Sequence, residues 1–236
     1  MSALHVTLDL VRHHLRRPLG WLLVVLLLLS WPALRTFLPL GLVTADLHHW
    51  TGAYEVAFLG GALVIVLGMA PLDGFSWLLR PAGPSGRIAL QGAALTLTAA
   101  LAGALALVPA HLFHEWQLVS FRAGESLGAL LLGWLHVAAL ALCALQLPLE
   151  PRVRAVLVLA LVTVVPGLLP GETGAGRAAL SWLDAGETLR GSFEFPLASA
   201  HWIGAGLPIF GWVACALALA APGPPRDPIH EIRDPR

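Results

Sequence analysis

The histidines of this chain are the residues whose type and spacing best suit metal chemistry. The 236 residues include ten histidines, and the sequence HLFH places His111 and His114 one helical turn apart. Two imidazoles on one face of a helix can bind the same metal ion. His114 also lies close to Trp116, and histidines near tryptophans are typical of the headgroup belt at a membrane surface. We therefore predict no metal site and retain His111 and His114 only as candidates.

His136 is the one ionisable residue that lies deep within an apolar stretch. An ionisable side chain inside a membrane span is a candidate functional residue. His136 and His201 are also the pair that could hold haem between two helices, although their expected depths differ. The alternative for His136 is a neutral imidazole that forms a hydrogen bond with a neighbouring helix. The sequence predicts no directly bound cofactor.

Catalytic motifs give little support for an enzyme. The chain contains no lysine, so it cannot carry the GxxxxGK[ST] loop that binds nucleotide phosphates. Glu115 follows His114, but the second histidine of a zinc-protease HExxH motif is missing. Cys143 and Cys215 lie in apolar runs, where a free thiol behaves as a small hydrophobic group, and we expect no structural disulfide. If ATP drives this protein, the nucleotide must bind to a separate subunit.

The elements that position these residues must be membrane helices, because the composition excludes a water-soluble surface. Hydrophobic residues make up 57% of the chain and charged residues 12%, compared with about 25% charged residues in soluble domains. The mean hydropathy is +0.77. The formal net charge is zero, so nothing indicates binding to nucleic acid. We predict an all-α, polytopic membrane protein.

Six apolar stretches approach or reach the length of about 20 residues that a helix needs to cross a bilayer. The first contains Arg35 between two prolines, and the fifth is short and ends near Pro166 and Pro170. Residues 18–222 therefore form a predicted transmembrane domain of six helices. The six stretches are 19–40, 54–72, 88–110, 126–148, 153–170 and 200–221.

The arginines set the expected orientation, since loops rich in basic residues remain in the cytoplasm. With six spans and both termini inside, ten of the fourteen arginines fall on the cytoplasmic side. We predict a multi-pass protein of the inner (plasma) membrane with both termini in the cytoplasm. The outer segment 171–199 suits either an interfacial helix around Trp182 or a polar loop, and residues 223–236 form a flexible, Pro-rich tail.

Residues 1–17 precede the first apolar stretch and have the pattern of an amphipathic helix. Such a helix lies in the membrane interface with its arginines towards anionic lipid. We expect Pro18 to end this helix, and the chain to enter the bilayer at Gly20 and Trp21. A cleaved signal peptide is the alternative, but no clean A-x-A site follows. The apolar face comprises Leu4, Leu8, Val11 and Leu15, and the polar face His5, Asp9, Arg12 and Arg16.

The connection between the second and third stretches is rich in turn residues. It has the sequence MAPLDGFSWLLRPAGPSGRIALQG, residues 69–92. We expect Asp73 and Gly74 to end the second span, SWLLR to form a short interfacial helix, and PAGPSG to form a turn. Arg87 then anchors the start of the third span.

A basic amphipathic helix, a sharp turn, six spans and this connection together resemble the membrane subunits of type 2 ABC transporters, an exporter-like permease family. The resemblance covers nearly the whole chain in architecture. In that family, the N-terminal helix and the connection between the second and third spans contact the partner ATPase. A plain turn whose arginines reach the headgroups is the alternative for the connection. The resemblance implies coupling to the ATPase through Arg12, Arg16, Asp73, Trp77, Arg80 and Arg87.

Two hypotheses for the function follow. The resemblance implies the permease subunit of an ABC exporter, with ATP on a separate ATPase subunit and a second permease copy or paralogue as partner. The alternative is a non-transport membrane subunit of a larger complex, such as a His-ligated cytochrome-like protein or an assembly protein. A co-purifying ATPase favours the first hypothesis, and a Soret absorption band favours the second. In both, the chain itself is not an enzyme and membrane lipids surround it.

Overall fold

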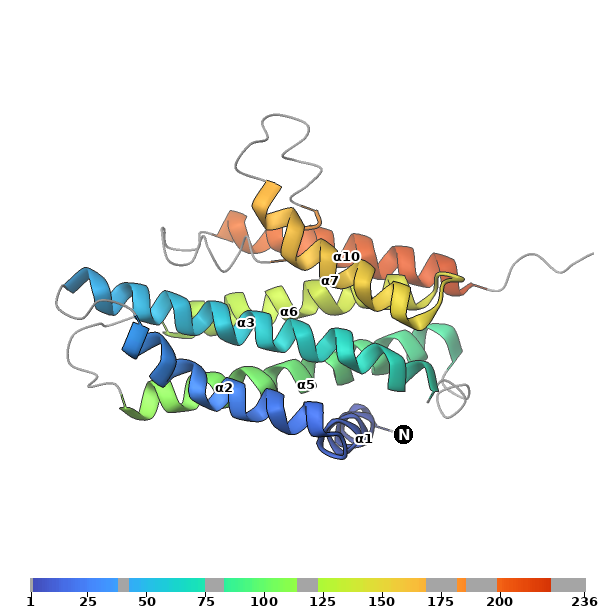
Figure 1. Ribbon diagram of the computed structural model, residues 1–236. Helices are drawn as coiled ribbons and strands as arrows, with labels where there is room; N and C mark the ends of the chain where they lie inside the picture. Colours follow the sequence, from blue (N-terminus) through green and yellow to red (C-terminus); the bar gives the residue numbers. More distant parts are fainter. Residues whose placement is uncertain are drawn as a thin grey trace, which may run out of the picture.

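The computed structural model describes residues 2–37, 43–74, 83–113, 123–168, 182–185 and 199–221. Every regular element in these ranges is an α-helix (Figure 1), which confirms the predicted all-α class. The helices are α1 (Ala3–Leu15), α2 (Pro18–Phe37), α3 (Val43–Gly74), α5 (Gly83–Phe113), α6 (Ala123–Leu145), α7 (Pro151–Leu168) and α10 (Ser199–Ala220).

Each of the six predicted apolar stretches corresponds to one long helix, and four of these helices contain a segment able to cross a membrane. In α2, the apolar segment among the described side chains is Pro18–Ser30, which is shorter than the candidate spans. Helix α7 is not among the candidate spans. The chain is therefore a multi-pass helical membrane protein by length and composition, whereas six complete spans stay a prediction. The candidate spans are Gly52–Asp73, Gly83–Pro109, Leu127–Leu145 and Ile203–Ala220.

Helices α3, α5 and α6 form the centre of the bundle. Helix α2 packs against α5 and α3, α7 packs against α3 and α6, and α10 packs mainly against α6 (Figure 1). The apolar windows of α3, α5 and α6 are 61%, 50% and 72% buried, whereas that of α10 is 11% buried. Helix α10 is therefore a peripheral helix whose position depends on its contact with α6.

Trp134 of α6 fills the space between α3 and α5. Its indole Nε1 donates a hydrogen bond of 3.2 Å to the Phe58 carbonyl of α3, and the side chain is buried. Gly61 of α3 and Gly103 of α5 make room for the ring, because a Cβ atom at either position would come within 2.3 Å of it. Small residues allow helices to approach closely in this way. One tryptophan thus joins the three central helices.

The long helices alternate in direction along the chain (Figure 1). The ends of α3, α6 and α10 and the starts of α2, α5 and α7 therefore lie at the same end of the bundle. We call this end the arginine end, because Arg87 of α5 and Arg154 of α7 both lie there. The first and last described residues of the chain are at this end, as the six-span prediction requires. The side of the membrane that it faces stays a prediction.

Helix α1 lies across the arginine end rather than along the bundle. Figure 1 views it almost along its own axis, while the long helices run across the picture. Val6 and Leu10 are buried against the core, whereas Leu4, Leu8 and Leu15 are exposed. A helix is present in the predicted segment, and it has a second apolar stripe, Val6 and Leu10, that the sequence prediction did not include. Its placement in the membrane interface stays a prediction. One stripe docks on the bundle, and the other faces outward.

The turn between α1 and α2 is tight. Helix α1 ends at Leu15 and α2 begins at Pro18, whose fixed φ suits the first position of a helix. The sequence predicts that Pro18 ends α1, but in the structure this residue opens α2. The Gly20 N–H donates to the Arg17 carbonyl at 3.0 Å. A Cβ atom at Gly20 would lie 2.0 Å from the His14 carbonyl oxygen, so only glycine fits without a backbone shift.

Candidate functional site

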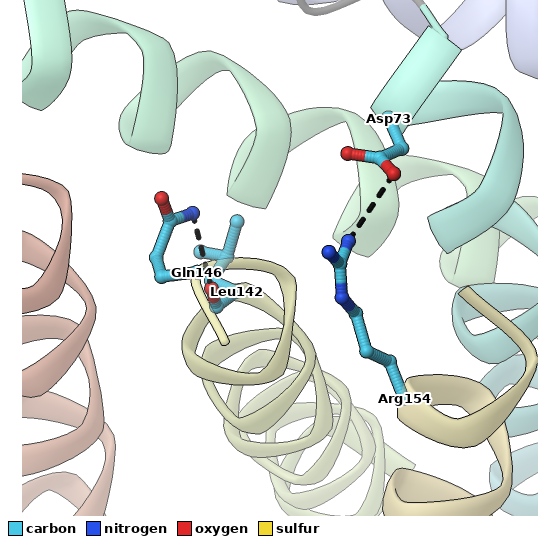
Figure 2. Close-up of polar contacts among 4 residues, drawn as sticks. All are labelled: Asp73, Leu142, Gln146 and Arg154. Atoms are coloured by element: carbon cyan, nitrogen blue, oxygen red, sulfur yellow. Dashed lines mark hydrogen bonds and ion pairs between the residues drawn. The ribbon is translucent and has the colours of Figure 1, made fainter. Parts of the chain in front are cut away.

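An ion pair at the arginine end joins two helices that are distant in the sequence. Arg154, in the first turn of α7, donates from Nη1 to Oδ2 of Asp73, near the end of α3, at 3.2 Å (Figure 2). The Arg154 side chain is 13% exposed and that of Asp73 is 42% exposed. A partly exposed pair of this kind contributes at most about 1 kcal/mol to stability. Its main effect is therefore to hold the start of α7 beside the end of α3.

Arg87, near the start of α5, makes a second contact at this end. Its Nη2 donates to Oε1 of Gln146 at 3.3 Å. Nε2 of Gln146 in turn donates to the Leu142 carbonyl at 3.3 Å (Figure 2). The Nε atoms of Arg87 and Arg154 are buried and make no hydrogen bond. Each Nε–H is a donor that no acceptor within the described residues satisfies. The arginine end therefore carries two unused donors on positively charged side chains.

The structure gives Asp73 and Arg87 different partners, although the resemblance assigns them to one coupling surface. Asp73 pairs with Arg154 and Arg87 with Gln146, so the two contacts together join four helix ends. The sequence analysis missed both partners. Arg154 was visible in the sequence only as one more basic residue near a span, because nothing local indicates which carboxylate an arginine will meet.

The two other coupling candidates that the structure describes, Arg12 and Arg16, lie on and just after α1. Nη1 of Arg12 is 3.8 Å from Oδ1 of Asp9, and the Arg12 side chain is 70% exposed. Arg16 is exposed and forms the C-cap of α1. Both guanidinium groups are thus accessible from outside the bundle. Trp77 and Arg80 lie outside the described residues.

His14 lies where α1 meets the bundle. Its Nε2 is buried without a hydrogen-bond partner, and a Cβ atom built on Gly68 of α3 would lie 4.0 Å from it. Burial lowers the pKa of His14 below its ordinary value, and the nearby His13 and Arg17 lower it further. The docked α1 therefore favours a neutral imidazole at this position.

His136 binds a backbone carbonyl from a segment far along the chain. Its Nε2 donates a hydrogen bond of 2.8 Å to the Trp182 carbonyl, and Nε1 of Trp212 on α10 donates to the same oxygen at 2.9 Å. His136 is midway along the candidate span Leu127–Leu145, and Trp212 is near the middle of Ile203–Ala220. The predicted alternative of a neutral imidazole bonded to a neighbouring element is the one that this geometry supports.

Residues 182–185, the described part of the predicted outer segment, form a turn. The choice between an interfacial helix and a polar loop for 171–199 stays a prediction. Asp184 and Ala185 are each 3% exposed. Gly211 of α10 makes room for the Trp182 ring, and Gly133 of α6 makes room for the Ala185 carbonyl. Irregular backbone at membrane depth is tolerated only when other groups satisfy its polar atoms. The two side-chain donors meet this condition for the Trp182 carbonyl.

The remaining chemical candidates gain no support from the contacts. Within the described ranges, no three His, Cys, Asp or Glu side chains gather as a metal site. His111 lies in α5, and His114 lies outside the described residues. Because Nε2 of His136 is already bound to a carbonyl, nothing favours this histidine as a haem ligand.

The sequence GESLG, residues 124–128, has the GxSxG spacing of serine hydrolases. In that motif the serine follows a strand and precedes a helix. Here the five residues belong to the first turns of α6, which begins at Ala123. The local structure therefore does not match the turn that exposes a catalytic serine.

Comparison with known proteins adds no relative to this picture. No family model, no curated protein and no solved structure matches the chain. By length and composition the helices define a multi-pass α-helical membrane protein, and the N-terminal helix α1 packs against the bundle. A more specific function rests on the arrangement of residues at the arginine end.

Proposed function

We propose that this chain is the permease subunit of an ATP-driven ABC exporter in the inner membrane. It acts with a second copy or a paralogue and with a separate ATPase subunit that binds ATP. The arginine end then faces the cytoplasm. The chain itself carries no nucleotide site, in keeping with its lack of lysine.

The observation that carries this proposal is the position of α1 at the arginine end. Helix α1 packs against α5 and α3, the two helices whose connection the family resemblance assigns to the ATPase. The end of α3 and the start of α5, which flank that connection, therefore lie at the same end of the bundle as α1. Exposed Arg12 and Arg16 provide donors for acidic groups of a partner.

The contacts also provide a route by which movement of the ATPase reaches the spans. Force on α1 passes to α3 and α5 through Leu10 and to α2 through the tight turn at Gly20. Force on the end of α3 passes to α7 through Asp73 and Arg154. A partner that pushes on this end can therefore tilt several helices together and open a path between two permease copies.

Co-purification of the full chain with an ABC ATPase from its native membranes tests the proposal. We expect Arg12→Glu and Arg16→Glu together to lower recovery of the ATPase at least tenfold and to reduce its activity in the complex. Glu55→Arg is the matched control, because it reverses an exposed charge towards the opposite end of α3. An ATPase that does not bind the wild-type chain contradicts the proposal, and so does equal recovery with all variants.

A further inference from the structure

Cys143 and Cys215 are the only cysteines of the chain, and the structure brings them together. The two residues are 72 positions apart, on α6 and α10, and their Sγ atoms are 3.2 Å apart. Both are free thiols. The sequence analysis expected two independent thiols in apolar runs. The fold instead produces a pair on two different helices.

The geometry of this pair suits a disulfide better than a metal. The two Sγ atoms are roughly 1 Å farther apart than the atoms of an S–S bond, whose length is about 2.05 Å. Small side-chain rotations can close this difference. A thiolate metal site normally needs three or four ligands, and among the described side chains no further His, Cys, Asp or Glu completes such a group. The surroundings are apolar, with Ile88, Leu142 and Ala216 in the same cluster.

We propose that Cys143 and Cys215 form a redox modification site whose oxidant is a hydroperoxide. Cys215 is the more exposed thiol and reacts first: its sulfur takes one oxygen from the peroxide, giving a sulfenic acid and, from hydrogen peroxide, water. The Cys143 sulfur then attacks the Cys215 sulfur, its thiol proton leaves with the hydroxyl group as a second water, and the S–S bond forms. Two thiols are oxidised by two electrons, and one peroxide is reduced.

The disulfide would act on α10, whose apolar segment is the least buried of the four candidate spans. Helix α10 is held to α6 at two levels: by the thiol contact towards the arginine end and by the Trp182 carbonyl near the middle. A disulfide turns the first of these contacts into a covalent one. Oxidation would therefore fix α10 against α6, and reduction would release it. This inference does not depend on the proposed transport function.

Native membranes that contain the full chain can be treated with hydrogen peroxide, denatured in detergent, and labelled with a maleimide that shifts gel mobility. We expect the untreated protein to take up two labels and the oxidised protein none, with both restored by dithiothreitol. Digestion after arginine should yield peptides 123–152 and 191–226 joined in one species. The linked peptides come from the wild-type chain, so this experiment does not depend on whether a variant folds.

The single variants Cys143→Ala and Cys215→Ala are the matched controls, since each keeps one thiol that has lost its neighbour. In Cys215→Ala we expect Cys143 to remain available for labelling at the peroxide concentration that removes both labels from the wild-type protein. In Cys143→Ala, peroxide should convert Cys215 to a sulfenic acid that dimedone traps, and no linked peptides should form. The proposal is overturned if the wild-type thiols stay labelled. Loss of the label from Cys215→Ala also overturns it, as does a disulfide between two chains.

Discussion

The Trp182 carbonyl shows how much of this structure depends on individual polar atoms. It accepts hydrogen bonds from His136 and Trp212, which come from two helices. Each donor alone can satisfy the oxygen, but losing both would leave the carbonyl without a side-chain donor, and a carbonyl left unpaired away from water costs about 1–3 kcal/mol. The two side chains should therefore depend on each other energetically.

This dependence predicts non-additive effects of His136→Leu and Trp212→Phe. We expect each single change to lower the free energy of unfolding by about 0.5–1.5 kcal/mol, the usual range for one hydrogen bond. The double variant should lose more than the sum, by at least about 0.5 kcal/mol. Unfolding in mixed detergent micelles measures all three values. Trp21→Phe, at a position that is 56% exposed, is the control for loss of an indole. If the losses of the two single variants add up to that of the double variant, the shared carbonyl does not couple His136 and Trp212.

At the scale of elements, the slot around Trp134 decides how closely the central helices pack. Gly103→Ala would place a methyl group 2.3 Å from the ring, and the neighbouring helices must move to accept it. We expect a loss of about 1–3 kcal/mol in the free energy of unfolding. The matched control is Gly204→Ala in α10, where a Cβ atom meets nothing within 4 Å. That change should be neutral or stabilising by up to about 1 kcal/mol, because alanine favours a helix. Equal changes in the free energy of unfolding for Gly103→Ala and Gly204→Ala would contradict the close packing of Gly103 against the Trp134 ring.

The docking of α1 should depend on pH through His14. Burial lowers the pKa of His14 from 6.5, so the docked helix binds a proton less readily than the undocked one. The resulting stabilisation is fully present above pH 6.5 and is lost as the pH falls through that value towards the lowered pKa. Hydrogen exchange in α1 should therefore show weaker protection at about pH 5.5 than at about pH 7.5, after correction for intrinsic rates.

The variant His14→Leu should remove most of this pH dependence, because leucine cannot take up a proton. His5→Leu, on an exposed part of α1, is the matched control and should behave as the wild-type chain does. If the protection of α1 changes equally with pH in all three proteins, His14 is not the group responsible.

At the scale of the whole molecule, the alternating helices place the first and last described residues at the arginine end. Ser2→Cys and Ala221→Cys, each in a chain without Cys143 and Cys215, should therefore react with a membrane-impermeant maleimide from the same side. We expect that side to be the cytoplasmic one, since basic residues gather there. Leu112→Cys, near the opposite end of α5, serves as the comparison and should not be labelled from that side. Labelling of Ser2→Cys and Ala221→Cys from opposite sides would contradict the arrangement.

The sequence was sufficient for properties that are local along the chain. Helix formation, the approximate helix limits and the amphipathic pattern of α1 follow from hydrophobic spacing and length, and the structure contains each of them. The end of α3 at Gly74 agrees with the turn residues that follow it. Pro18 was expected to end α1, but it is the first residue of α2. A proline that is excluded from a helix interior is favoured at the first position of the next helix.

Tertiary structure alone decided which of these helices meet and through which atoms. Arg154 and Asp73 are 81 positions apart, Cys143 and Cys215 are 72, and Trp134 donates to a carbonyl 76 positions away. Hydrophobic periodicity shows that a face will be buried, but many partners satisfy an apolar face equally well. The choice depends on how side chains fit into gaps left by glycines on other helices, and that fit exists only after the bundle has assembled.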